Sequence, residues 1–85
     1  MAGSARSRLL YELIIQCQHF STKSTDNRYV LDIREKELAA RIGLSRETIN
    51  REVRKLKKEK LITLSHRHII IPSIDNLKHK LEQSI

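Results

Sequence analysis

The sequence contains a single cysteine and no apolar segment long enough to span a lipid bilayer. Cys17 has no second cysteine with which to form an intramolecular disulfide, which is usual in proteins of a reducing compartment. The longest apolar run, residues 9–15, is interrupted by Glu12 and is much shorter than the ~20 residues of a transmembrane helix. No secretory cleavage pattern follows it. We therefore expect a cytoplasmic protein that does not engage a membrane.

The sequence also lacks the short motifs of common catalytic and cofactor sites. It has no G-x-G-x-x-G, no phosphate-binding loop, no nucleophile elbow and no zinc-binding spacing. His66 and His68 are two residues apart without a third ligand nearby in the sequence, which favours phosphate contact or solvation over a metal site. We expect a binding module rather than an enzyme, with no metal and no cofactor held by this chain.

Acidic residues are few relative to basic ones. The 85 residues include 17 lysines and arginines against 10 aspartates and glutamates, giving a net charge of +7. This surplus favours an anionic partner, with nucleic acid ahead of a membrane or an acidic protein. Apolar residues make up 39% and charged residues 32% of the chain, a balance typical of one small folded domain.

The first third of the chain has the pattern of a helix, a loop and a short strand. We exclude residues 1–5 from the fold as a disordered leader and assign residues 6–85 to one domain. The apolar spacing predicts an amphipathic scaffold helix over residues 6–20, with Cys17 packed inside it rather than acting as a redox sensor. We then expect an exposed loop over residues 21–28 and a short strand over residues 29–33, whose partner is not obvious.

The middle of the chain predicts two helices around a tight turn. A short helix over residues 35–42 is ended by Gly43, and Ser45 is placed to cap a second helix over residues 45–60. Ala39 is small enough to let the two helices approach closely. Two short helices around a glycine-containing turn, the second with a polar face, form the helix-turn-helix pattern.

The second of these helices separates apolar from basic side chains. With about 100° of rotation per residue, Ile49, Val53 and Leu56 fall in one stripe that must be buried. A broad face of about 140° points away from this stripe and carries mostly basic side chains: Arg46, Asn50, Arg51, Arg54, Lys57 and Lys58. A basic helix face is often only a solvated surface, so the face alone does not identify a nucleic-acid site.

Glu47 lies on this basic face and makes the pattern more informative. A carboxylate on a surface that meets phosphates is electrostatically costly unless it accepts a hydrogen bond from a specific donor. The N4 amino group of cytosine is such a donor, and the planar forks of Arg46 and Arg51 match O6 and N7 of guanine. We therefore interpret the face as a reader of G·C base pairs in the major groove.

The last third of the chain predicts a β-hairpin followed by a helix. Residues 61–64 and 69–71 are rich in β-formers, and residues 65–68 form a basic tip between them. In winged-helix domains such a hairpin rests on the phosphate backbone beside the groove. A final helix with Ile74 and Leu77 on its inner side would cover the core. The expected fold is mainly α with a small β-hairpin wing (α+β), a winged helix-turn-helix.

Residues 37–71 resemble the DNA-binding domain of the Crp/Fnr family of bacterial transcription regulators. The segment ELAARIGLSRETINREVRKLKKEKLI followed by a short wing carries the resemblance, and GLSRETINR is its most specific part. The resemblance implies that Arg46, Glu47 and Arg51 read bases of a TGTGA-like half-site. It also implies sequence-specific binding of double-stranded DNA as the output of a transcription regulator.

The resemblance further implies that Ser45 and Thr48 anchor phosphates of the DNA. We expect additional phosphate contacts from residues on the basic face, the wing and the preceding helix: Lys36, Asn50, Arg54, Lys57, Ser65 and Arg67. Two positions depart from the usual family pattern, because Arg34 stands where many relatives have Ser or Thr, and His66 where many have Gly.

Full-length members of this family carry an N-terminal effector domain and a long dimerisation helix, neither of which is found in these 85 residues. We therefore expect an isolated output domain or a fragment that is monomeric and binds one half-site weakly. The parent protein would be a homodimer on a palindromic operator, with RNA polymerase a candidate partner, and its effector cannot be read from this sequence. Two alternatives stay open, a winged-helix protein-interaction module and a non-specific nucleic-acid binder.

Overall fold

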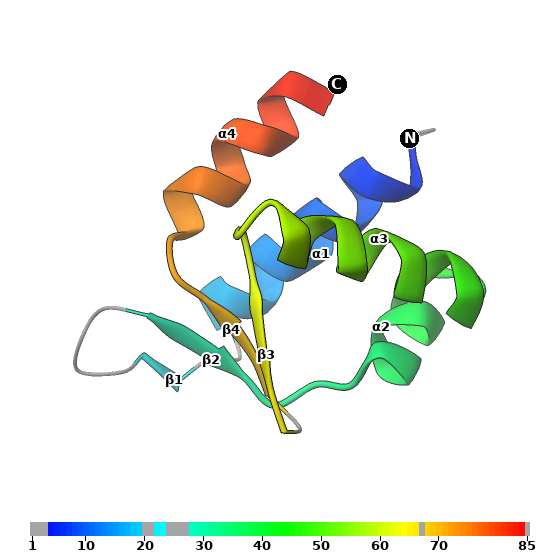
Figure 1. Cartoon of the computed structure of the whole chain (residues 1–85), viewed down its shortest axis with the longest axis horizontal. Coiled ribbons are helices and arrows are strands. Elements are labelled where there is room, and N and C mark those ends of the chain that lie inside the picture. Colours follow the sequence, from blue (N-terminus) through cyan, green and yellow to red (C-terminus); the bar gives the residue numbers. More distant parts are fainter. Residues whose placement is uncertain (1–3, 20–21, 24–27, 67, 85) are drawn as a thin grey trace.

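The structure is a computed structural model that describes residues 4–19, 22–23, 28–66 and 68–84. The described residues form helices and strands in the following order: α1 (Ala5–His19), β1 (Thr22–Lys23), β2 (Tyr29–Leu31), α2 (Glu35–Ile42), α3 (Arg46–Lys58), β3 (Thr63–Ser65), β4 (His68–Ile71) and α4 (Ile74–Ser84). Figure 1 shows the sheet on one side of the molecule and the α2 and α3 pair on the other. This arrangement is the expected winged helix-turn-helix.

The strands form one antiparallel sheet in the order β1-β2-β4-β3. The hairpin of β3 and β4 confirms the predicted wing, but its tip is shorter than expected. Ser65 pairs with His68, so both residues belong to the strands rather than to the tip. His66 has a positive φ of 53°, the left-handed conformation that two-residue hairpin turns favour. Glycine adopts this backbone without the steric cost that histidine meets.

The predicted strand over residues 61–64 is wrong at its first two positions. Leu61 and Ile62 lie between α3 and β3 and are both buried, so their side chains fill the core without joining the sheet. β-Propensity reflects how well a side chain fits a half-buried surface, and core positions in connecting segments select the same apolar residues. Local composition therefore could not separate the connection from the strand.

The strand without an obvious partner pairs with the second strand of the wing. β2 runs antiparallel to β4, with Val30 opposite Ile70, and β1 pairs with the other edge of β2. This strand ends at Leu31, although Ile33 beyond it is also buried. Residues 22–23 belong to β1, which corrects the expectation of a loop at these two positions; residues 20–21 and 24–27 lie outside the described part of the chain.

Helix α1 begins at Ala5, inside the segment that we assigned to a leader. The hydroxyl oxygen of Ser4 accepts a hydrogen bond of 3.1 Å from the amide of Ser7, which satisfies an otherwise free donor of the first turn. At the other end of the chain, Ser73 accepts a 3.3 Å hydrogen bond from the amide of Asn76 at the start of α4. This hydrogen bond caps the last helix.

The core lies where α1, α2, α3 and α4 meet the sheet. Each contributes large apolar side chains with almost no exposed surface: Leu9, Leu10, Leu13, Leu31, Leu38, Ile49, Leu56, Ile62, Ile71 and Leu77. The predicted stripe of α3 is confirmed, because Ile49, Val53 and Leu56 are all buried. Burying this stripe against the other helices leaves the basic face of α3 exposed.

Cys17 is packed into this core, and we expect it to react slowly with thiol reagents. Its side chain is 3% exposed, and burial raises the pKa of the thiol to about 11. Because the thiolate is the reactive form, the folded chain should react with a chromogenic disulfide reagent at pH 8 roughly 100-fold more slowly than the urea-unfolded chain. Equal rates for the two states would contradict the packing of Cys17.

Candidate nucleic-acid interface

The turn between α2 and α3 has the geometry that the sequence predicts. Gly43 adopts a left-handed conformation with φ of 78°, which suits glycine, and its amide donates a hydrogen bond to the carbonyl of Ala39. Ser45 caps α3, since its hydroxyl oxygen accepts a hydrogen bond of 3.1 Å from the amide of Thr48. The start of α3 is thus set directly by its own residues.

The start of α2 is capped in a different way, because Arg34 has no side-chain acceptor for a backbone amide. The carboxylate of Glu37 instead accepts a 3.2 Å hydrogen bond from the amide of Arg34. This bond is the reverse half of a capping box and satisfies a backbone donor at the helix terminus. An arginine before α2 is therefore compatible with a well-formed helix.

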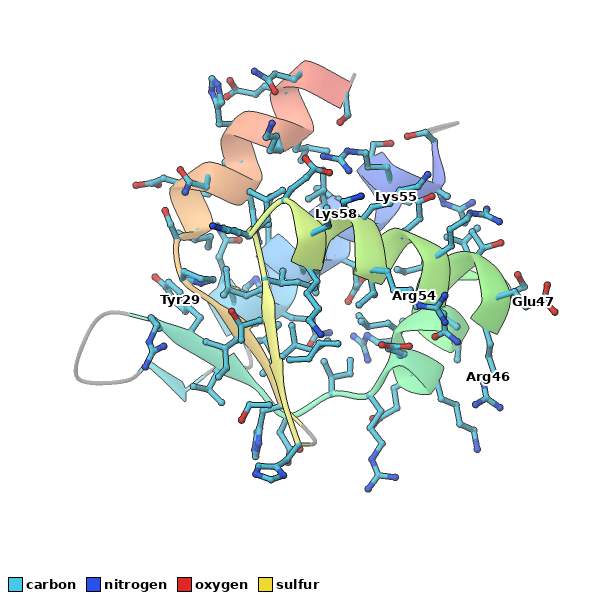
Figure 2. All side chains as sticks on the ribbon, in the orientation of Figure 1. Tyr29, Arg46, Glu47, Arg54, Lys55 and Lys58 are labelled. Carbon is cyan, nitrogen blue, oxygen red and sulfur yellow. The ribbon has the colours of Figure 1, made fainter. Side chains whose placement is uncertain are left out.

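Two of the three predicted base readers, Arg46 and Glu47, are adjacent in the first turn of α3. Figure 2 shows Arg46 and Glu47 pointing outward from the molecule, and both side chains are exposed. Arg51 and Arg54 are exposed further along the helix, and Asn50 is half-buried. The helix ends at Lys58, two residues before the predicted end, with Glu59 at the C-cap and Lys60 in a left-handed conformation.

The hydroxyl groups of Ser45 and Thr48 at the start of α3 are linked by a hydrogen bond. The Ser45 hydroxyl donates a hydrogen bond of 2.9 Å to Oγ1 of Thr48, while it also accepts from the Thr48 amide. Its single proton is therefore engaged inside the cap. The hydroxyl proton of Thr48 stays available for an outside acceptor such as a phosphate oxygen.

An open hollow of about 490 Å³ separates the helix-turn-helix from the wing. Its lining combines residues of α2, α3, β3, β4 and the wing turn: Ile33, Arg34, Glu35, Lys36, Arg46, Leu64, His66, His68 and Ile69. Lys36 and Arg46 therefore face the same space as the two wing histidines. Ser65 is half-buried in the hairpin, and Arg67 lies outside the described residues.

The described residues contain no group of three or more histidine, cysteine or acidic side chains that could hold a metal ion. Within the same part of the chain, every helix is too short or too polar to cross a bilayer.

Helix α1 supports the helix-turn-helix through polar contacts that sequence reasoning missed. The guanidinium of Arg8 donates a hydrogen bond to the carbonyl of Ile42, one of the last carbonyls of α2. Glu12 accepts a 3.1 Å hydrogen bond from Nε of Arg41. These partners are 34 and 29 residues apart in the sequence, so no local pattern could reveal them. They hold the end of α2, and with it the turn, against α1.

A third contact from α1 reaches the far end of α3. The two terminal nitrogens of Arg6 donate hydrogen bonds of 2.7 and 2.8 Å to the carboxylate of Glu59, and Nζ of Lys80 lies 3.8 Å from the same carboxylate. The hydrogen bond from Arg6 lowers the pKa of Glu59 below its ordinary value. The ends of α1, α3 and α4 are thus joined by one bidentate ion pair and one longer contact.

The profile of the Crp-like helix-turn-helix domain matches residues 7–80, which is most of the chain. The chain belongs to this family. No curated protein sequence matches it significantly. The family match agrees with the order of the elements, because it covers most of α1, the helix-turn-helix, the wing and most of α4.

Solved structures with this fold include several transcriptional regulators. A CRP/FNR-family regulator from Thermus thermophilus superimposes with a TM-score of 0.86 at 23% identity, over 98% of this chain and 43% of that chain. A CRP-family regulator from the same organism has a TM-score of 0.79 at 20% identity, over 95% and 42% of the two chains. The CO-dependent transcription factor CooA from Carboxydothermus hydrogenoformans has a TM-score of 0.77 at 22% identity, over 89% and 36%. The Crp-like domain therefore spans less than half the length of these proteins.

The ion pair between Arg6 and Glu59 should stabilise the domain in a pH-dependent way. A double-mutant cycle with Arg6→Gln and Glu59→Gln should give a coupling of about 0.5 kcal/mol at pH 7, because both groups are partly exposed. Since the pKa of Glu59 is lowered in the folded state, the stabilisation is present above the ordinary value of 4.5 and is lost as the pH falls below it. Urea unfolding at several pH values measures this coupling, and a coupling that stays constant from pH 7 to pH 3 would contradict the prediction.

Proposed function

We propose that this domain binds double-stranded DNA in a sequence-specific manner as the output domain of a transcription regulator. Helix α3 would enter the major groove, and the wing of β3 and β4 would rest on the backbone beside it. The observation that carries the proposal is the exposure of Arg46 and Glu47 at the first turn of α3, on a helix whose opposite side is buried. In helix-turn-helix proteins the N-terminal residues of the recognition helix contact base edges.

The three reader side chains match the chemistry of a TGTGA-like half-site. Arg46 and Arg51 would each pair bidentately with O6 and N7 of a guanine, and Glu47 would accept a hydrogen bond from N4 of a cytosine. The acid on the basic face has a role in this arrangement, because its carboxylate would disfavour base pairs that present an acceptor at its position.

The remaining contacts would position the domain without reading bases. Ser45 and Thr48 would anchor a phosphate together: Thr48 would donate its hydroxyl proton to it, and Ser45, which donates to Oγ1 of Thr48, would hold that hydroxyl in place. Further phosphate contacts would come from the basic face of α3, the start of α2 and the wing: Asn50, Arg54, Lys57, Lys36, Ser65 and Arg67. Such contacts set affinity and salt dependence rather than specificity.

A single Crp-like domain would occupy one half-site. Binding a palindromic operator would need two copies one helical turn apart, about 34 Å, so we propose a homodimeric parent protein and a weakly binding monomer for these residues alone. RNA polymerase is a candidate partner of the parent at a promoter, and the site of action would be the cytoplasm.

Fluorescence anisotropy with a TGTGA-containing duplex and a scrambled duplex of equal length tests the proposal. We expect a preference of about tenfold or more that persists when the salt concentration is raised, because base contacts do not depend on counterion release. Equal affinities that fall together with rising salt would contradict base reading. They would favour the non-specific or protein-docking alternatives.

Replacing Arg46 and Lys57 separately distinguishes base reading from phosphate contact. Arg46→Ala should cost about 1–3 kcal/mol on the specific site and relax specificity at one base pair. Lys57→Ala serves as the charge-matched control, and it should weaken binding to all duplexes alike and reduce the salt slope by about one unit. A uniform loss from Arg46→Ala would count against its role as a reader.

Removing Glu47 should raise the affinity for non-specific DNA while it lowers specificity. Because Glu47→Ala removes a negative charge from a basic face, binding to scrambled DNA should become tighter. Discrimination at the cytosine that Glu47 reads should fall by about 1–3 kcal/mol, since its acceptor is lost. Anisotropy with duplexes substituted one base pair at a time measures both effects. Unchanged discrimination at every position would remove Glu47 from the set of readers.

A further inference from the structure

Glu52 is a buried acidic residue on the helix that carries the proposed base readers. Its exposed fraction is 6%, and it is the one buried acid among the described residues. It follows Arg51 directly and lies at the border between the buried stripe of α3 and its basic face. A buried carboxylate is costly unless charged or polar partners satisfy it, so its position requires an explanation from its contacts.

Two ion-pair partners of this carboxylate lie on the same helix, and Arg6 of α1 also interacts with it electrostatically. Oε2 of Glu52 lies 3.4 Å from Nζ of Lys55 and 3.8 Å from Nε of Arg51. The Arg51 side chain is 61% exposed, whereas that of Glu52 is 8% exposed. The Nε end of a largely exposed side chain therefore lies near a carboxylate that is itself buried.

The contact point on Arg51 determines which of its donors stay free. Nε is the nitrogen nearest the helix, and the two terminal amino groups lie beyond it on the guanidinium plane. A guanine is bound by two donors that face O6 and N7 together, which the terminal amino groups can supply without Nε. At 3.8 Å the contact is an ion pair rather than a hydrogen bond, so the carboxylate attracts the Nε side of the guanidinium and leaves its outer edge available to a base.

We propose that Glu52 is a positioning residue that orients Arg51 for base reading. The proposal rests on the function proposed above and adds a specificity determinant that does not itself contact DNA. Arginine loses rotamer freedom when it is immobilised, so partial ordering before binding reduces the cost of forming the guanine pair. The geometric precision of the Arg51 contact would then depend on a residue that faces the core.

A purely structural role for Glu52 makes a different prediction. Replacing a buried ion pair by an apolar side chain of similar volume is often neutral or stabilising. Glu52→Met removes only one member of each pair, but the Arg51 and Lys55 side chains are 61% and 56% exposed and stay hydrated without it, so the midpoint of urea unfolding should stay unchanged or rise. If Glu52 served only to satisfy Lys55, the same variant would leave base discrimination unchanged. Base discrimination, rather than stability, therefore separates a positioning role from a purely structural one.

The experiment measures discrimination at each base pair by anisotropy for the wild-type chain, Arg51→Ala and Glu52→Met. The Arg51→Ala variant identifies the base pair that Arg51 reads. Glu52→Met should reduce discrimination at that pair about three- to tenfold, leave the pair assigned to Arg46 unchanged, and have no further effect in the Arg51→Ala background. Glu59→Gln is the matched control, because it removes the same charge near the end of α3 and should preserve discrimination at both pairs.

A second measurement tests the positioning in the absence of DNA. The Nε–H signal of Arg51 in ¹⁵N relaxation experiments should show more restricted motion than that of Arg54, another exposed arginine of α3. Glu52→Gln should bring Arg51 to the level of Arg54, and this variant also covers the case in which Glu52→Met does not fold. Equal mobility in the wild-type chain would overturn the positioning role whatever the DNA result.

The binding outcomes distinguish failure of the inference from failure of the proposed function. Unchanged discrimination at the Arg51 pair, or an equal loss at the Arg46 pair, would overturn the role of Glu52 while leaving DNA recognition intact. A wild-type chain without any base preference would overturn both proposals together.

Discussion

Burial of the apolar stripe on α3 is the constraint on which the rest of the interface depends. Ile49, Val53 and Leu56 are removed from water against the other helices, and this fixes the rotation of α3 about its own axis. Because side chains project at fixed angles from a helix, the same rotation directs Arg46 and Glu47 away from the core. The basic face is exposed as a consequence of packing on the opposite side.

Helix α1 contributes more than apolar surface to this arrangement. Arg8 and Glu12 hold the end of α2, and Arg6 holds the residue that caps the end of α3. The turn between α2 and α3 also has its own local determinants in Gly43 and Ser45. Local turn chemistry and long-range ionic contacts therefore support the same geometry, which is the consistency expected of a sequence that specifies one fold.

The errors in the sequence-based boundaries arise from features of the fold that local composition does not encode. The strand predicted from Leu61 begins two residues later, because buried connecting residues have the same composition as strand residues. The end of α3 and the start of the wing turn coincide with left-handed conformations at Lys60 and His66, which neither residue type indicates. Pairing of β2 with β4 joins segments about 40 residues apart in the chain, and no local signal specifies it.

The sequence by itself determined the elements whose signals are local: the spacing of apolar residues in α1 and α3, the glycine turn, the serine cap, and the set of side chains on the basic face. These features depend on residues within about one helical turn of each other, where helical geometry is regular. Only the tertiary structure decided which residues support that face. The contacts of Arg6, Arg8 and Glu12, the hollow beside the wing, and the burial of Glu52 depend on how separate elements pack. Such packing is set by the whole core, so it cannot be read from any single segment.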